Sequence, residues 1–330
     1  MENARATSDA YRRFACVEAR GKSPLYERLC EGVAGDAELL GFLGRLSPAK
    51  RQPNLVLAAV RHLFGTQPDY PAFRSAVLEH PAEVAELLAA RRTQTNEPGR
   101  CAALLPVLAA LPQPLALLEV GAAAGLCLLP DRYAYRYGTY RVGTAELVFD
   151  CAPHGPVPLP ERLPTVVWRA GIDLEPVDLE DRGAVRWLEA LVWPEEHDRL
   201  ERLRHAIEIA RRDPPRVVQG DLLEALLPVA LEAPRDATLV VFHTAVLSYL
   251  SEDERGRFEA QVRSLAAEWI SNESEGVLRG LPPPDVAPRA ASHFLVSRNG
   301  ERVVALCDPH GRWLQWTRET GSDPVSRGTA

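Results

Sequence analysis

The segment Leu117-Leu118-Glu119-Val120-Gly121-Ala122-Ala123-Ala124-Gly125 decides the fold, because an apolar run ends there in a turn made only of glycine and alanine. Buried parallel strands are apolar on both faces, so the run from Leu115 to Val120 predicts an internal strand. Glycine lets backbone N–H groups approach a ligand, and we expect a helix to begin directly after the turn. Glu119 would stand at the carboxyl end of the strand as a hydrogen-bond acceptor. The segment predicts a nucleotide-type cofactor site.

The spacing of the small residues distinguishes two kinds of cofactor. A dinucleotide fingerprint needs G-x-G-x-x-G, but counting from Gly121 places Ala123 and the bulky Leu126 at its second and third glycines. The pattern acid-x-G-x-G-x-G instead aligns Glu119, Gly121, Ala123 and Gly125, with alanine at the middle glycine only. This pattern resembles motif I of the class I S-adenosylmethionine-dependent methyltransferases. A tight strand-to-helix turn in another kind of α/β protein is the alternative.

Composition restricts the class of protein further. The chain has 330 residues, which suits one large or two ordinary domains, and a formal net charge of −7, which does not favour nucleic-acid or anionic-membrane partners. The six cysteines form no C-x-x-C pair and the histidines no H-E-x-x-H motif, so we expect free thiols and no metal. The stretch from Met1 to Phe14 lacks the apolar core of a secretory signal, and no run is long enough to span a bilayer. We therefore expect a cytoplasmic protein.

The pattern of apolar residues divides the chain near residue 112. Before that point it has helical spacing, which predicts an all-helical N-terminal domain over residues 1–112. The predicted helices are Ser23 to Cys30, Asp36 to Leu46, Asn54 to Phe64, Tyr70 to Leu78, Pro81 to Arg91 and Gly99 to Leu111.

After residue 112 strands alternate with helices, which predicts a mostly parallel sheet over residues 113–330. The predicted strands are Leu115 to Val120, Thr165 to Ile172, Arg216 to Gly220, Thr238 to His243, Trp269 to Glu273, Phe294 to Arg298, Arg302 to Cys307 and Gly311 to Trp316. The Asn299-Gly300 turn makes Phe294 to Cys307 an antiparallel hairpin. The fold class is therefore α/β, a Rossmann-like methyltransferase sheet behind a helical domain, with an inserted segment around residues 130–163.

Polar residues follow several of these strands, where ligands bind in open α/β sheets. Motif resemblance to the methyltransferases implies that Asp173, after the second strand, binds the ribose hydroxyls. It implies further that Gly220, Asp221 and Leu222, after the third, hold the adenine. The segment from His243 to Leu250, after the fourth, would face the methyl donor and the substrate. As alternatives, the two aspartates are helix caps or turn residues, His243 is a satisfied core histidine, and Tyr249 only packs.

The connection between the glycine turn and Asp173 is about 45 residues, far longer than usual. Its alternating sequence predicts an inserted hairpin, in which Tyr133 and Tyr135 would line a substrate pocket. An exposed edge hairpin covered by aromatic pairs is the alternative. The length also leaves Asp150 or Glu146 as possible ribose ligands.

A dense polar stretch from Arg91 to Arg100 lies between two apolar helices. We interpret it as a lid or substrate loop, with Gln94, Asn96 and Arg100 as substrate-binding candidates, against the alternative of a plain linker. Glu97 in the same stretch is a candidate proton acceptor.

Five phrases of the sequence resemble the DUF2332 family of uncharacterised bacterial, commonly actinobacterial, proteins. The phrases are Thr93 to Glu97, Leu118 to Leu126, Arg169 to Pro176, Trp193 to Glu195 and His243 to Leu247. The likeness extends over nearly the whole chain. It implies a methyltransferase-like core behind a helical N-terminal domain, and it gives the polar stretch weight as a site element.

These patterns favour an S-adenosylmethionine-dependent methyltransferase of a small molecule, with His243 as the first candidate base and Glu97 as the second. No Asp/Asn-Pro-Pro-Tyr motif occurs, which disfavours methylation of nucleic-acid amino groups. A non-catalytic binding or regulatory protein with the same fold is one alternative. An NAD(P)-dependent oxidoreductase is another, opposed by the glycine spacing. The absence of G-x-S-x-G opposes a serine hydrolase.

Overall fold

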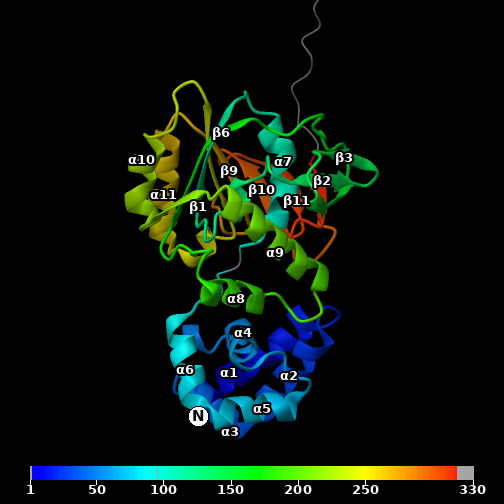
Figure 1. Ribbon diagram of the computed structural model, residues 1–330, viewed down its shortest axis with the longest axis vertical. Helices are drawn as coiled ribbons and strands as arrows, with labels where there is room; N and C mark the ends of the chain where they lie inside the picture. Colours follow the sequence, from blue (N-terminus) through cyan, green and yellow to red (C-terminus); the bar gives the residue numbers. More distant parts are fainter. Residues whose placement is uncertain (1, 95, 318–330) are drawn as a thin grey trace, which may run out of the picture. The chain divides into compact units, whose positions relative to one another are not determined.

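The computed structural model describes residues 2–94 and 96–317. The chain is a mixed α/β protein with a helical N-terminal region and a large, mostly parallel sheet (Figure 1). It forms two compact units, the first made of Met1–Thr95 and Val177–His205, the second of Asn96–Pro176 and Ala206–Ala330. Thr95, within the predicted substrate loop, and residues 318–330, at the end of the predicted α/β domain, lie outside the described residues.

Helices build the first unit, and their starting residues show why they form. Ser23, Asp36 and Asp69 each accept a backbone N–H of the helix that follows, which satisfies donors left open at a helix start. The helices of the N-terminal segment are α1 (Glu2–Arg13), α2 (Pro24–Gly35), α3 (Ala37–Gly44), α4 (Pro53–Phe64), α5 (Tyr70–Glu79) and α6 (Pro81–Ala90), with a π-helical turn at Phe14–Ala19 and a 3-10 turn at Pro48–Lys50. The last five of these helices correspond to predicted ones, although α2 ends at Gly35 and not at Cys30, whereas α1 was not predicted.

The first unit is completed by a segment from later in the chain. After the second core strand the chain runs through α8 (Arg182–Leu191) and α9 (His197–Arg212). Trp187 of α8 belongs to the same apolar core as the N-terminal helices, and its Nε1–H donates to the carbonyl of Arg92 at 3.0 Å. The hydroxyl of Ser23 donates to Glu195 at 2.6 Å. The helical unit is thus discontinuous in sequence.

The second unit is organised by a nine-stranded sheet of order β5-β12-β11-β10-β9-β8-β1-β6-β7. Its strands are β1 (Leu115–Val120), β5 (Ala152–His154), β6 (Val166–Asp173), β7 (Arg216–Gln219), β8 (Thr238–Thr244), β9 (Glu268–Ser274), β10 (Phe294–Arg298), β11 (Arg302–Cys307) and β12 (Trp313–Trp316). Strands β9, β8, β1, β6 and β7 are mutually parallel. The hairpin β10–β11 is antiparallel, and its turn has positive φ at Asn299 (56°) and Gly300 (63°), as predicted for an Asn-Gly turn.

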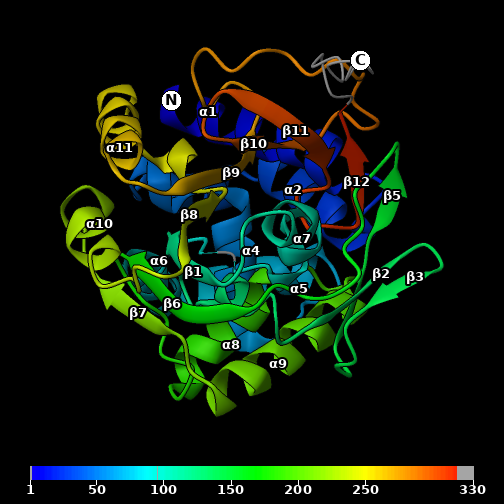
Figure 2. The same cartoon turned by 90° about the horizontal axis from the view of Figure 1, so that it is seen from above.

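Helices cover both faces of this sheet. Helices α10 (Leu222–Ala230) and α11 (Glu252–Ser264) lie on one side and α7 (Cys101–Ala109) on the other (Figure 2). The side of α10 and α11 is an apolar core that includes Leu226, Phe258 and Trp269. Strand β1 is buried along its whole length, as its continuous apolar run predicts.

A small separate sheet, of order β3-β2-β4, follows the glycine turn. Its strands are β2 (Ala134–Tyr137), β3 (Tyr140–Val142) and β4 (Val148–Asp150). Strands β2 and β3 form an antiparallel hairpin inside the predicted insertion, but the second alternating stretch, 144–149, leads into β4, which pairs parallel to β2 and is not an arm of that hairpin.

The helix expected directly after the glycine turn is absent from the described chain, and that prediction is wrong. Only a 3-10 turn, Leu126–Leu128, follows Gly125. All residues from Leu126 to Pro130 are buried, so the segment has no polar face for an amphipathic helix, and Pro130 opposes its continuation. Among the described residues, no helix has the length and apolar character needed to cross a bilayer.

Candidate functional site

The glycine turn follows β1 at the carboxyl edge, the edge of the sheet where the parallel strands end. Its small residues are required by its backbone conformation and by close packing. Gly121 has φ +71°, and a Cβ on it would lie 2.3 Å from Cγ2 of Val246, in the segment after β8. Gly125 also has φ +71°, and even Ala123 has a positive φ of 50°. The turn therefore combines left-handed backbone conformations with a close contact to the end of β8.

The backbone N–H groups of Gly121, Ala122, Ala123 and Gly125 donate within the protein. Gly121 and Ala122 both donate to the carbonyl of Ile172, at 2.8 and 3.1 Å, and Ala123 donates to Oδ2 of Asp173 at 2.8 Å. Leu126 donates to Oδ1 of Asn96 at 3.0 Å. The expectation that this turn offers several free amides to a ligand is therefore wrong. Without a following helix, the loop folds back and satisfies these donors.

Asp173 lies at the end of β6, next to the turn. Its Oδ2 accepts from Ala123 and its Oδ1 from the N–H of Glu175 at 2.9 Å. The two alternative ribose ligands lie elsewhere, because Asp150 pairs with Arg136 in the small sheet and Glu146 is exposed on the loop before β4. Of these three acids, the structure brings Asp173 to the turn.

Glu119 is the most unusual group at this edge. It is 1% exposed, and its Oε2 has no hydrogen-bond partner among the described residues. Burial raises the pKa of this carboxyl well above its usual value, Cys127 and Asp173 raise it further, and the Arg100 guanidinium acts in the opposite direction. A buried polar group without a partner indicates a missing donor.

Three residues of the polar stretch, Asn96, Glu97 and Arg100, belong to the second unit and lie at the carboxyl ends of the strands. Asn96 spans the turn, since its Nδ2 donates to Ala122 O at 3.2 Å while its Oδ1 accepts from Leu126. Glu97 caps the next 3-10 turn, Pro98–Arg100, by accepting from Gly99 N at 3.0 Å. Arg100 donates through Nη1 to the carbonyl and hydroxyl of Thr244, at 3.0 and 3.1 Å. Three predicted residues, Asn96, Glu97 and Arg100, are thus buried at the carboxyl edge.

Gln94 belongs to the first unit, where its N–H donates to Arg92 O at 3.0 Å. It is therefore not placed relative to these residues.

His243 lies on the face of the sheet opposite to Glu119, and both of its ring nitrogens have hydrogen-bond partners. Its Nδ1 lies 2.7 Å from Oε1 of Glu273, and Nε1–H of Trp269 donates to its Nε2 at 3.0 Å. Nε2 is therefore the acceptor nitrogen and Nδ1 the donor. At 0% exposure, His243 has the environment of a satisfied core histidine and offers no free nitrogen to a substrate.

Sequence reasoning missed Glu273 and Asn272 at the end of β9. Oε1 of Glu273 also accepts from Val246 N and Leu247 N, at 2.8 and 3.1 Å, which fixes the segment that contacts Gly121. Asn272 is 0% exposed, and its Nδ2 has no partner among the described residues. The signal was present, since the apolar pair Trp269-Ile270 is followed by a polar run that contains both residues at the end of a predicted strand.

The remaining predicted residues have mostly structural surroundings. The buried hydroxyls of Tyr133 and Tyr135 donate to the carbonyls of Leu126 and Pro130, both at 2.8 Å, so these rings do not line an open pocket. Tyr249, in contrast, is 74% exposed in the 3-10 turn Leu247–Tyr249 after β8.

The adenine candidates lie where β7 meets α10. Asp221 caps α10 by accepting from Leu223 N at 2.7 Å, and Leu222 packs on the apolar core. Gly220 donates to the carbonyl of Asp173 at 2.9 Å.

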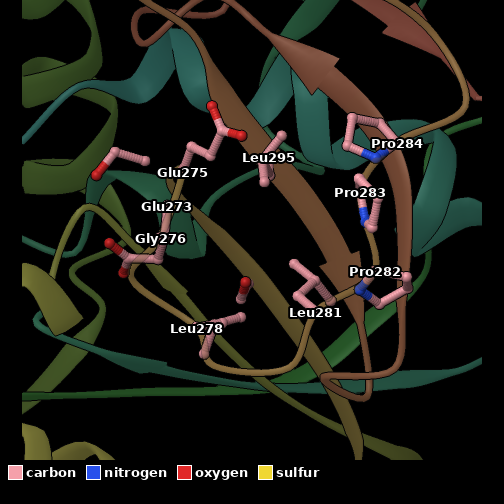
Figure 3. A pocket seen from close by; sticks show the side chains of 11 residues that line it. Glu273, Glu275, Gly276, Leu278, Leu281, Pro282, Pro283, Pro284 and Leu295 are labelled. Carbon is pink, nitrogen blue, oxygen red and sulfur yellow. The ribbon is translucent and has the colours of Figure 1, made fainter.

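A cavity of about 230 Å³ opens beside the end of β9. Its lining comes from β9, the following loop and β10 (Figure 3). Leu278, Leu281, Leu295 and three consecutive prolines, Pro282 to Pro284, make much of it apolar. Among the described residues, no group of histidine, cysteine, aspartate and glutamate side chains is arranged to hold a metal ion.

The fold is that of an α/β protein. Its buried polar side chains are concentrated at the carboxyl ends of the parallel strands. The chain belongs to DUF2332, a family described as uncharacterised proteins conserved in bacteria, whose profile matches residues 8–316. This confirms the resemblance inferred from the five phrases. No curated protein and no solved structure matches the chain.

Proposed function

We propose that this chain is a cytoplasmic methyltransferase that uses S-adenosylmethionine to methylate a small molecule. The donor would bind at the carboxyl ends of β1 and β6, and the acceptor at the ends of β8 and β9.

Strand order supports a ligand site at this edge. Numbered along the chain, the parallel strands β7, β6, β1, β8 and β9 have the order 3-2-1-4-5, which doubly wound nucleotide-binding sheets share. In such sheets the ligand binds outside the carboxyl ends, where the order reverses, and here the reversal lies between β1 and β8. Glu119 is the penultimate residue of β1.

The unpartnered Oε2 of Glu119 is the observation that carries the proposal. A carboxyl group at 1% exposure is costly unless it is neutral or meets a donor. The ammonium of an adenosyl amino acid is a donor of the required kind, and the charge of that ammonium favours the ionised acid. The residues at this edge are therefore compatible with S-adenosylmethionine. The contacts would be made by side chains and not by the backbone amides of the turn.

Asp173 is the candidate for the ribose hydroxyls. Its carboxylate lies at the end of β6, next to β1, and accepts backbone N–H groups of Ala123 and Glu175, so it is fixed at the proposed donor site. Gly220, Asp221 and Leu222, after the neighbouring strand β7, remain the candidates for the adenine.

The bound donor supplies an electrophilic methyl group, so the protein needs chiefly to align the acceptor and to remove a proton where the acceptor carries one. Both ring nitrogens of His243 are engaged, so the proposal gives it no direct role. Glu97, which lies at the carboxyl edge, is the candidate proton acceptor.

Isothermal titration calorimetry tests the proposal with S-adenosylmethionine, S-adenosylhomocysteine and NADPH. We expect both adenosyl ligands to bind, with dissociation constants on the order of micromolar, and no heat from NADPH. Glu119→Ala should weaken adenosyl binding about tenfold or more, whereas Glu161→Ala, at an exposed loop position, should not. Heat from NADPH alone would assign the site to an oxidoreductase.

A non-catalytic binding protein is the second candidate, and two observations favour it. Four backbone N–H groups of the glycine turn donate within the protein, and His243 is occupied on both nitrogens. This candidate predicts adenosyl binding without formation of S-adenosylhomocysteine across a broad panel of acceptors.

A further inference from the structure

We propose that the methyl acceptor carries a carboxylate, and that Arg100 and Asn272 bind it. This inference rests on the proposed function, since it names the class of molecule that the same site would methylate.

Arg100 is a buried cation whose hydrogen-bond partners are neutral. It is 6% exposed; Nε donates to Pro309 O at 2.9 Å and Nη1 to Thr244, and its guanidinium carbon lies 5.7 Å from the ring centre of Phe294. Within the described chain, no carboxylate forms an ion pair with it and its Nη2 has no hydrogen-bond partner. The guanidinium lowers the pKa of Glu119, but burial favours the neutral form of that acid, so a bound anion would stabilise the charge of Arg100. Guanidinium groups bind carboxylates through two parallel hydrogen bonds.

Asn272 supplies an independent second donor. Its side chain is fully buried, its Oδ1 accepts from Sγ of Cys307 at 3.3 Å, and its Nδ2 has no partner in the described part of the chain. Amide donors without partners are rare in protein interiors, so a bound acceptor is expected here as well.

The sheet register places the two donors together. Asn272 is the in-register neighbour of Thr244, so the two side chains lie on one face, with strands about 4.8 Å apart. Nη1 of Arg100 is 3.1 Å from the hydroxyl of this same Thr244. The guanidinium and the amide therefore lie beside each other on the face opposite to His243 and Glu273.

Arg100 acts electrostatically on Glu119, but Arg100 and Asn272 meet at the ends of other strands than those that carry the groups assigned to the donor. Glu119 and Asp173 belong to β1 and β6, whereas Thr244 and Asn272 end β8 and β9. Glu119 shares the face of Thr244, because it pairs in register with Phe242, two residues earlier in β8. One face of the sheet thus offers an acid for an ammonium and, on neighbouring strands, two donors for an anion.

A carboxylate on this site could belong to the acceptor or to the amino-acid part of the methyl donor. We assign it to the acceptor, and the experiment separates the two sources. Benzoate, phenylacetate and hexanoate, with benzamide, phenylacetamide and hexanamide as neutral counterparts, are titrated into the protein alone and into the protein saturated with S-adenosylhomocysteine.

We expect at least one carboxylate to bind with a dissociation constant of about 10 mM or lower and its amide about tenfold more weakly. Binding should persist in the saturated protein. Equal affinity for acid and amide, or no binding of any acid, overturns the inference. Competition with S-adenosylhomocysteine overturns the assignment to the acceptor.

Variants test the residues. Arg100→Gln and Asn272→Asp should each weaken carboxylate binding about tenfold or more, while Arg216→Gln, at an exposed arginine of β7, should leave it unchanged. Arg100→Lys retains the charge and serves if Arg100→Gln does not fold; it should keep a preference for acids over amides. Unchanged affinity in a folded Arg100→Gln protein overturns the inference.

The two proposals fail separately. Carboxylate binding that depends on Arg100, without any binding of S-adenosylhomocysteine, overturns the methyltransferase and leaves an anion site. Binding of S-adenosylhomocysteine without discrimination between acids and amides leaves the proposed function intact and overturns this inference.

Discussion

Oδ2 of Asp173, the last residue of β6, accepts a hydrogen bond of 2.8 Å from the backbone N–H of Ala123 in the turn after β1. The bond links the ends of two neighbouring parallel strands at the edge where the ligand site is proposed. Asp173 therefore has a structural role beside any contact with ribose, and the two roles have different readouts.

Asp173→Ala should lower the free energy of unfolding by about 2 kcal/mol, because it removes the acceptors of the Ala123 and Glu175 N–H groups. Urea denaturation measures this change. Asp213→Ala, which removes a half-exposed surface ion pair with Arg132, should cost less than about 1 kcal/mol. If the two variants were equally stable, the Asp173 bonds would not hold the edge together.

Gly121→Ala should destabilise the protein by about 1–3 kcal/mol, since the new Cβ would lie 2.3 Å from Val246 and the residue would keep φ near +71°. Gly256→Ala is the matched control, because Gly256 lies inside α11 and a Cβ on it would meet no other atom within 4 Å. That variant should gain about 0.5–1 kcal/mol. Thermal unfolding of both proteins is the measurement, and opposite shifts are expected.

Glu119→Gln should change how stability depends on pH. The pKa of Glu119 is raised in the folded protein above the value of 4.5 for an unperturbed glutamate. The stability contribution of such an acid is present below pH 4.5 and is lost as the pH rises towards the folded-state pKa. Relative to wild type, the ligand-free variant should therefore become more stable as the pH increases.

Urea denaturation of wild type and Glu119→Gln at about pH 4.5 and about pH 8 checks this prediction. Glu161→Gln, at an exposed loop position, is the control variant. A stability difference that is constant with pH would mean that folding does not raise the pKa of Glu119, and one that shrinks would mean that the folded protein stabilises its ionised form.

Trp269→Phe should cost about 1–3 kcal/mol, because it leaves Nε2 of His243 buried without its donor. It should leave binding of S-adenosylhomocysteine within about twofold of wild type, since His243 lies on the face opposite to Glu119. A loss of binding without a loss of stability would return His243 to the ligand site.

Much of the fold could be predicted because its signals are local. The buried run from Leu115 to Val120 gave the first strand, and the Asn299-Gly300 pair gave the hairpin. The grouping of Val177–His205 with the N-terminal helices could not be predicted, because it depends on packing between segments far apart in sequence. The missing helix after Gly125 has a related cause, since a fully buried apolar segment has no periodicity that distinguishes helix from loop.

The candidate site was predicted in part. Strand-end reasoning found Glu119 and Asp173, and the density of polar residues found Asn96, Glu97 and Arg100. Strand-end reasoning gave His243 too direct a role, because the sequence does not show that Trp269 and Glu273 form hydrogen bonds with its ring nitrogens. Asn272 was missed because the orphaned state of its amide appears only once β8 and β9 are placed in register.

Calorimetric titration of S-adenosylhomocysteine into wild-type protein and into Glu119→Ala tests the proposed ligand site most directly. We predict one binding site per chain in wild type and a loss of affinity of about tenfold or more in the folded variant, because the buried acid is the proposed partner of the ligand's ammonium. Absence of binding in wild type, or equal affinity in the two proteins, would contradict this assignment.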